Sequence, residues 1–148
     1  MKRLAVILTL AFSLVGFSSF ANGEDLAPAA AVQSFKNSFK TATEVSWSAT
    51  ESFHKVSFFL NGQPVSAFYS AQGEMIAITR SINSLQLPIA LQASLKKDYD
   101  AYWISDLFEM ANEEGTSYFI TLENADTKLV LKSTAASEWT SFRKQRKS

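Results

Sequence analysis

Residues 53–70, FHKVSFFLNGQPVSAFYS, decide the fold of this chain. Two runs rich in β-branched and aromatic residues flank Asn61-Gly62, the preferred pair for a type I′ hairpin turn, in which both residues need a positive φ. We therefore predict antiparallel strands at 53–60 and 63–70. Alternation puts Val56, Phe58, Leu60, Val65, Ala67 and Tyr69 on one face and Phe53, Lys55, Ser57, Phe59, Pro64, Ser66 and Phe68 on the other. The first face is the more apolar, so we expect a helix to cover it.

The flanking sequence predicts a helix before this hairpin and a strand on each side of it. Pro28 suits the first position of a helix, where its missing N–H costs nothing. Apolar residues then follow at spacings of three and four, which places them on one helix face: Val32, Phe35 and Phe39. Polar and apolar residues alternate over 44–48, and a β-prone run at 75–80 follows a turn at Gly73, so both segments are predicted strands.

The same order recurs about sixty residues later in the sequence. Leu87-Pro88 opens a second predicted helix, with Leu91, Leu95 and Tyr99 on one face. Four predicted strands follow, at 102–110, 117–122, 128–132 and 138–143. We predict an α+β fold: one domain over 28–143 in which two tandem helix-plus-four-strand repeats, 28–82 and 87–143, form an antiparallel sheet with helices packed on one face.

The first 21 residues have the features of a secretion signal. Lys2 and Arg3 precede an apolar run that ends at Gly16, and Ser19-Phe20-Ala21 offers small residues at the cleavage positions. The run is shorter than the roughly 20 apolar residues of a membrane-spanning helix. We predict cleavage after Ala21, a linker at 22–27 and a periplasmic location. Because the chain contains no cysteine, we do not expect a lipoprotein acylated on that residue.

The charge of the chain argues against a nucleic-acid-binding protein. Without Lys2 and Arg3 it has 12 basic and 14 acidic side chains, whereas nucleic-acid binders carry a strongly basic surface. Basic residues concentrate only near the C-terminus, in Arg143-Lys144-Gln145-Arg146-Lys147. Two interpretations stay open, a solvated and frayed basic tail over 144–148 and a binding patch, and we favour the tail.

No residue pattern indicates an enzyme, a metal site or a cofactor. His54 is the single histidine, and without a cysteine to serve we interpret it as an ordinary strand residue rather than a general base. Glu113-Glu114, and Asp98 with Asp100, lack the further ligands that a metal site needs. The five glycines form no phosphate-binding loop.

Short motifs along the chain occur in a characteristic order: Pro28-Ala29-Ala30-Ala31-Val32, Glu44-Val45-Ser46-Trp47, Leu60-Asn61-Gly62, Ala67-Phe68-Tyr69 before Gly73, and Leu87-Pro88. Together they resemble the PepSY-like, β-lactamase-inhibitor-like family of bacterial periplasmic proteins, over residues 27–142. The second half departs from the family pattern, with Asp98-Tyr99-Asp100-Ala101 where Pro-Gly is usual and Asn124-Ala125-Asp126 in place of an Asn-Gly turn. The resemblance implies a sheet backed by helices, a periplasmic location and binding or inhibition of other proteins, with no catalytic residues.

Aromatic residues supply the candidate binding face. If helices cover one sheet face only, the opposite face exposes rings beside a lysine: Phe53, Lys55, Phe59, Phe68 and Phe119, the last alongside Lys128 and Lys132. Exposed aromatic patches often mark protein-binding surfaces. An equally open interpretation is that the other repeat, a dimer partner or the linker buries this face.

We therefore predict an exported, non-catalytic protein-binding module that uses the open sheet face, with inhibition of a periplasmic enzyme as one form of that function. The partner would be a protein or peptide of the periplasm. The alternative is a structural or assembly component of the cell envelope that acts as a homodimer through the same faces.

Overall fold

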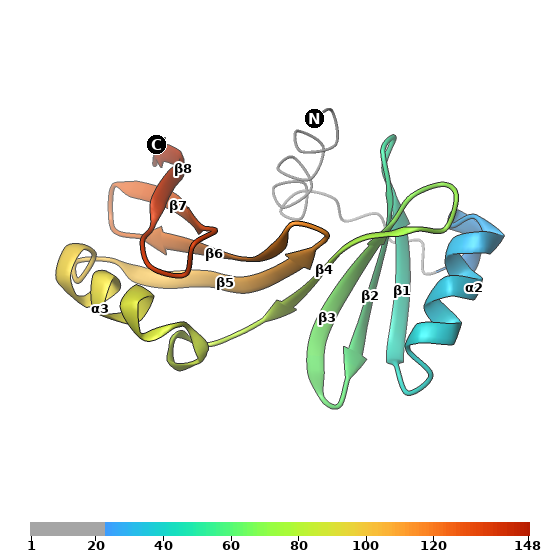
Figure 1. The fold of residues 1–148 in the computed structure, drawn as a ribbon. Helices are drawn as coiled ribbons and strands as arrows, with labels where there is room; N and C mark the ends of the chain where they lie inside the picture. The colour runs from blue at the N-terminus through green and yellow to red at the C-terminus, as the bar shows by residue number, and fades with distance from the viewer. Residues whose placement is uncertain (1–22) are drawn as a thin grey trace. The chain divides into compact units, whose positions relative to one another are not determined.

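The computed structural model describes residues 23–148, and the predicted signal peptide, 1–21, lies outside the described residues. The described chain divides into two compact units, which we call unit 1, ending at Ile78, and unit 2, beginning at Thr79. The elements are η2 (Glu24–Leu26), α2 (Ala29–Ser38), β1 (Thr43–Ala49), β2 (His54–Leu60), β3 (Gln63–Tyr69), β4 (Met75–Ser81), η3 (Ser84–Gln86), α3 (Ile89–Asp98), β5 (Trp103–Asn112), β6 (Gly115–Glu123), β7 (Thr127–Ser133) and β8 (Thr140–Arg146). The eight strands follow sequence order in one sheet (Figure 1).

The predicted α+β class is confirmed. A short 3₁₀ helix, an α-helix and four strands occur twice in the same order, and the strand pairs within the units are antiparallel. That the two halves are tandem copies of one sequence stays a prediction, as does a single domain over 28–143.

The hairpin predicted from Asn61-Gly62 is confirmed in both turn geometry and register. Asn61 and Gly62 have φ values of 52° and 78°, as a type I′ turn requires. Leu60 pairs with Gln63, and Phe58 pairs with Val65. A turn of this kind fixes which side chains share a face, because a slip of one residue would exchange the two faces.

The core of unit 1 forms between α2 and one face of β1–β3 (Figure 1). Phe35 of α2 lies 5.0 Å from Phe58 and 5.6 Å from Trp47, measured between ring centroids. The buried members of this core are Ala31, Phe35, Trp47, Val56, Phe58, Val65, Ala67 and Tyr69. The helix therefore covers the face that alternation predicted to be the more apolar.

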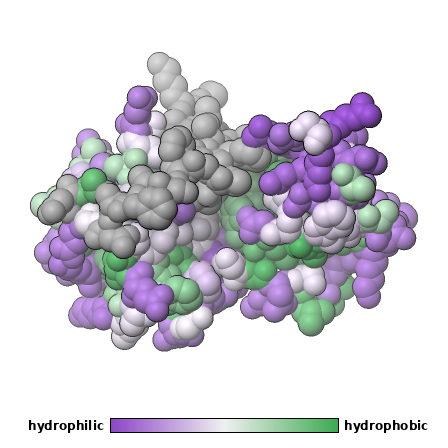
Figure 2. Space-filling model, turned by 180° about the vertical axis from the view of Figure 1, so that it is seen from behind, coloured by the Kyte–Doolittle hydropathy of each residue, from purple (hydrophilic) through white to green (hydrophobic). Residues whose placement is uncertain are grey.

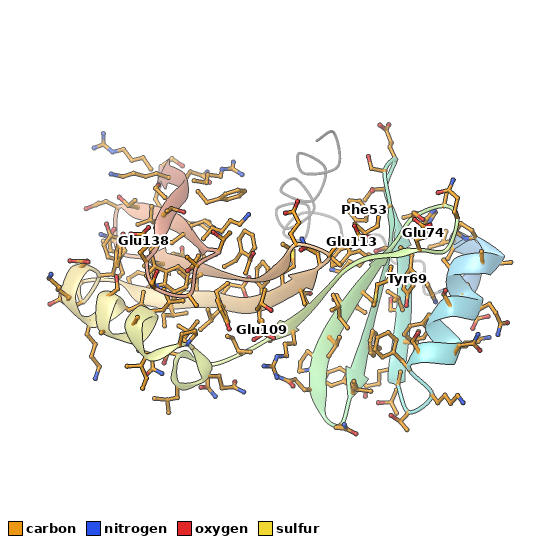
Figure 3. The ribbon with its side chains drawn as sticks, viewed as in Figure 1. Phe53, Tyr69, Glu74, Glu109, Glu113 and Glu138 are labelled. Atoms are coloured by element: carbon orange, nitrogen blue, oxygen red, sulfur yellow. The ribbon has the colours of Figure 1, made fainter. Side chains whose placement is uncertain are left out.

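Tyr69 carries a polar atom into this core, beside α2 (Figure 3). Its hydroxyl is buried and has no hydrogen-bond partner among the described residues, and burial raises the pKa of Tyr69. We expect Tyr69→Phe to leave the free energy of unfolding unchanged or to raise it by up to about 1 kcal/mol, since the substitution removes an unpaired polar group.

Urea unfolding measures this effect, with Tyr118→Phe as the matched control. The Tyr118 hydroxyl bonds to Glu109, so its removal should cost about 0.5–1.5 kcal/mol. A comparable loss for Tyr69→Phe would contradict the unpaired state of that hydroxyl.

Unit 2 packs its helix against the sheet in the same manner. Leu91 of α3, which is fully buried, joins a core cluster on β5–β7: Leu87, Leu91, Leu107, Ile120, Leu122, Leu129 and Leu131. Trp139 packs at its margin, and the indole Nε1 donates to the carbonyl oxygen of Leu91 at 3.2 Å. Arg80 of β4 forms a bidentate pair with Glu109 of β5, which is labelled in Figure 3. The Arg80 Nε donates to Oε1 at 2.9 Å and its Nη2 donates to Oε2 at 3.2 Å.

Some predicted boundaries are wrong by a few residues, for identifiable reasons. Pro28 and Pro88 are the N-caps of α2 and α3 rather than their first residues, and both have extended backbones with ψ near 140°. The linker predicted at 22–27 includes the 3₁₀ helix η2, whose Glu24 forms an ion pair with Lys36 at 2.9 Å.

Candidate functional site

The face predicted to expose aromatic rings is largely covered. Phe53, Phe68 and Phe119 are only 6%, 1% and 2% exposed, so their predicted exposure is wrong. Phe59 does reach solvent, with 36% of its surface exposed, and Lys55 is half-buried. Three of the four rings are therefore buried, and Phe59 alone among the four is exposed.

Within each unit, rings on this face pack against one another. In unit 1, Phe53, which immediately precedes β2 and is labelled in Figure 3, meets Phe68 edge to face with centroids 5.5 Å apart. In unit 2, Phe119 stacks on Phe108 at 5.2 Å and meets Phe142 edge to face at 5.8 Å. Alternation along a strand gives the face on which a ring lies, but the neighbouring side chains decide whether water reaches it.

A lysine accompanies the buried ring on this face in each unit. Lys55 pairs with Phe68 across β2 and β3, and Lys132 pairs with Phe119 across β6 and β7, with its ammonium 5.3 Å from the ring centroid. Burial lowers the pKa of both lysines. Their alkyl stems cover apolar rings, so replacing Phe68 would disturb folding before it reported on binding.

His54 joins two elements of unit 1. Its Nδ1 donates to the carbonyl oxygen of Leu26 at 3.2 Å, which ties β2 to η2.

Within residues 23–148, no three His, Cys, Asp or Glu side chains come together in a way that could hold a metal ion. Glu113 lies at the β5–β6 turn (Figure 3). None of the helices in this part of the chain is long and apolar enough to cross a membrane.

The most exposed large apolar side chains of the described chain lie where α3 begins. Leu85 of η3 is 81% exposed and Ile89 of α3 is 83% exposed. We call these two residues the apolar pair. Their neighbours Leu87 and Leu91 are 3% and 0% exposed, so the backbone that presents the pair is anchored in the core of unit 2. Figure 2 shows that hydrophobic residues reach the surface in groups bordered by hydrophilic ones.

Hydrogen bonds hold the backbone around the apolar pair. Asn83 caps η3 by accepting from the Leu85 N–H at 3.0 Å, while the Asn83 N–H donates to Gln86 Oε1 at 2.9 Å. The Gln92 amide donates to the carbonyl oxygens of Leu85 and Leu87, at 3.2 and 2.8 Å. The pair therefore projects from a fixed support, and binding would order little further backbone.

Unit 1 shows that the fold itself does not need aliphatic side chains at these places. Asp25 is the middle residue of η2, as Leu85 is of η3, and Ala29 begins α2, as Ile89 begins α3. The same helix start thus forms with only a methyl group at the position that Ile89 occupies. Exposed Leu and Ile at the corresponding positions of unit 2 contribute little to stability, which points to a role in contact.

The apolar pair was not predicted from sequence, although one signal was available. Ile89 lies off the helix face of Leu91, Leu95 and Tyr99, so the helical period alone places it away from the core. No comparable signal marks Leu85, because a three-residue 3₁₀ helix is too short to show a period.

The basic C-terminus is an ordered strand, and the predicted frayed tail at 144–148 is wrong for residues 144–146. β8 pairs with β7 as far as Arg146, which lies opposite Thr127. Beyond the strand, the Lys147 ammonium lies 3.1 Å from Glu123 Oε1, donates to the carbonyl oxygen of Asn124 at 2.8 Å and lies 4.8 Å from the Trp103 ring centroid. The pairing of β8 with β7 and these side-chain contacts order the segment, although its charged side chains are well solvated.

The fold and these surfaces define an α+β scaffold with an antiparallel sheet and one packed helix in each unit. No protein-family model matches the chain, and no curated protein sequence is detectably similar to it. Solved structures are similar in fold. A BLIP-like protein of Bacteroides fragilis is 18% identical, with a TM-score of 0.67 over 82% of this chain and 87% of that one.

Two further solved structures share the fold. A protein of Bacteroides eggerthii proposed to be periplasmic is 17% identical, with a TM-score of 0.72 over 81% of this chain and 88% of that chain. A DUF2874 family protein of Bacteroides uniformis is 20% identical, with a TM-score of 0.71 over 81% and 89%. At these identities the likeness concerns the fold. It agrees with the β-lactamase-inhibitor-like part of the resemblance and does not test the PepSY-like part.

Proposed function

We propose that this chain is an exported, non-catalytic protein-binding module that contacts its partner through the apolar pair, Leu85 and Ile89. The observation that carries the proposal is that these two side chains are more than four-fifths exposed on a backbone fixed by core residues and hydrogen bonds. Enclosing such side chains in a partner's pocket removes apolar surface from water without ordering further backbone.

Two observations support a binding rather than a catalytic role. His54, the one histidine, bonds to a backbone carbonyl, and the described residues gather no metal-binding cluster. The signal-like features of residues 1–21 support export to the periplasm. The likeness to a BLIP-like structure and the PepSY-like sequence motifs support a finer form of the proposal, in which the partner is a periplasmic enzyme that the module inhibits.

The experiment compares the wild-type chain with Leu85→Ser/Ile89→Ser. Each is purified after export, immobilised, and exposed to periplasmic extract of the source bacterium, and the bound proteins are identified by mass spectrometry. We expect the double variant to lose the wild type's specific partner. Loss of two anchor side chains typically weakens binding by at least about 2 kcal/mol, or roughly thirtyfold.

Val45→Ser/Met75→Ser is the matched control, since it removes two exposed apolar side chains of unit 1, 39% and 46% exposed. It should keep the partner. Equal retention of the partner by both variants would refute the role of the apolar pair. Light scattering of the wild type tests the alternative, because a homodimer that dissociates in the Leu85→Ser/Ile89→Ser variant would make the partner a second copy of this chain.

A further inference from the structure

We propose that the outer edge of β8 binds an extended, acidic polypeptide segment by adding it to the sheet as a further strand. This proposal rests on the proposed function and deepens it, because it names the chemistry of the segment that the partner presents.

The position of β8 supplies the backbone groups for such binding. β8 is the last strand in the sheet order and pairs with β7 on one side. In an antiparallel pair, alternate residues direct their backbone N–H and C=O groups away from the partner strand. An edge of this kind is a template for an added strand, in which the main chain supplies affinity and the side chains supply specificity.

The charge of β8 selects the added segment. Arg143, Lys144 and Arg146 lie within the strand, whereas no acidic residue occurs between Glu138 and the end of β8. Lys144 and Arg146 are exposed. A second copy of β8 would place like charges opposite one another, which is destabilising, whereas an acidic strand would place opposite charges there.

Protection of the sheet edge is the competing explanation for these cations, because lysines commonly guard exposed edges. A single charge is enough to interrupt unwanted strand pairing. Three cations within the four residues 143–146 exceed that need. They occur, moreover, in a chain that is otherwise richer in acidic than in basic side chains, so they do not follow from its overall composition.

Contacts at both ends of β8 hold the edge in an extended shape. At its start, the Thr140 hydroxyl donates to the carbonyl oxygen of Lys132 at 3.0 Å, next to Trp139, whose indole bonds to α3. At its end, the Lys147 N–H donates to the carbonyl oxygen of Asp126 at 2.8 Å. A strand held at both ends loses little conformational freedom when a segment binds beside it.

A polypeptide fits this edge better than a nucleic acid or an anionic membrane. Backbone N–H and C=O groups recur along the edge at the spacing of another polypeptide strand. A nucleic acid or a lipid surface would use the cations and leave those groups unmatched. Blocking the backbone of a bound peptide should weaken strand addition, whereas a contact made through charge alone should not change. An experiment can therefore separate these modes of binding.

The experiment measures fluorescence anisotropy of a labelled seven-residue peptide of alternating Val and Glu, titrated with protein purified after export. We expect saturable binding that weakens at least tenfold in Lys144→Gln/Arg146→Gln. Lys96→Gln/Lys97→Gln, which removes two exposed charges from the end of α3 in the same unit, should bind as the wild type does. Urea unfolding of both variants shows that each is folded.

Two N-methylated versions of the peptide test the backbone contacts directly, each blocked at alternate residues along one edge. Strand addition requires at least one of them to lose binding while its charge is unchanged. The proposal is overturned if the parent peptide does not bind, if both methylated peptides bind as the parent does, if the two charge variants weaken binding equally, or if a single-stranded oligonucleotide or vesicles containing anionic lipid bind more tightly.

The assay separates this inference from the proposed function. Leu85→Ser/Ile89→Ser should retain peptide binding, because the apolar pair is not on β8. If capture of the partner depends on the apolar pair while no acidic peptide binds, only the strand-addition proposal fails. If the peptide binds at β8 while partner capture is insensitive to Leu85 and Ile89, only the role of the apolar pair fails.

Discussion

Phe58→Ala should lower the free energy of unfolding by about 3–5 kcal/mol, the usual cost of truncating a buried phenylalanine. Phe58 is 2% exposed, and its ring centroid lies 5.0 Å from that of Phe35 and 4.9 Å from that of Phe39. The truncation would open a cavity between α2 and the sheet and remove two aromatic contacts. Urea unfolding followed by circular dichroism measures the change.

Phe59→Ala is the matched control, because it makes the same chemical change one residue along the same strand. Phe59 lies on the opposite face and is 36% exposed, so we expect it to lose less than half as much stability as Phe58→Ala, since the truncation leaves a smaller cavity. Equal losses for the two variants would mean that α2 does not distinguish the faces of β2, and the core assignment of unit 1 would be wrong.

The local elements of the fold could be predicted from sequence because each has a short-range cause. Asn61-Gly62 determines a turn, the turn determines the register, and the register determines that Val56 and Phe58 meet the helix. The strand over 117–122 is found as part of β6, with Ile120 and Leu122 in the core of unit 2. Periods of two and of 3.6 carry this information within a few residues.

The candidate site was harder to predict because exposure depends on contacts distant in sequence. Phe119 contacts Phe108 and Phe142, which stand 11 and 23 positions away along the chain. The local sequence of the basic segment indicates a solvated tail, yet the segment pairs with β7 as far as Arg146. The exposure of Leu85 likewise depends on how Leu87 and Leu91 pack against distant residues of β5–β7.

Gly73→Ala should cost more than about 3 kcal/mol of unfolding free energy, because two separate penalties combine at this turn. Gly73 has a φ of 84°, a conformation that costs an L-residue roughly 1–2 kcal/mol. A Cβ at this position would also lie 2.7 Å from the backbone carbon of Ala30 and 2.8 Å from its oxygen. Since those atoms belong to the α2 backbone, the clash is relieved only if the helix moves away from the sheet. That movement would also strain the hydrogen bond of 2.9 Å that the Ser34 hydroxyl donates to the Gly73 carbonyl oxygen.

Gly62→Ala separates the two penalties. Gly62 has a similar φ of 78°, but a Cβ there would meet no atom within 4 Å. It should therefore cost only the conformational term, about 1–2 kcal/mol. Thermal and urea unfolding of both variants give the difference between them, which measures how firmly the β3–β4 turn is packed against the start of α2. If the two substitutions cost the same, the close approach of Gly73 to Ala30 contributes nothing to the position of the helix, and the turn must be free to move when a side chain is added.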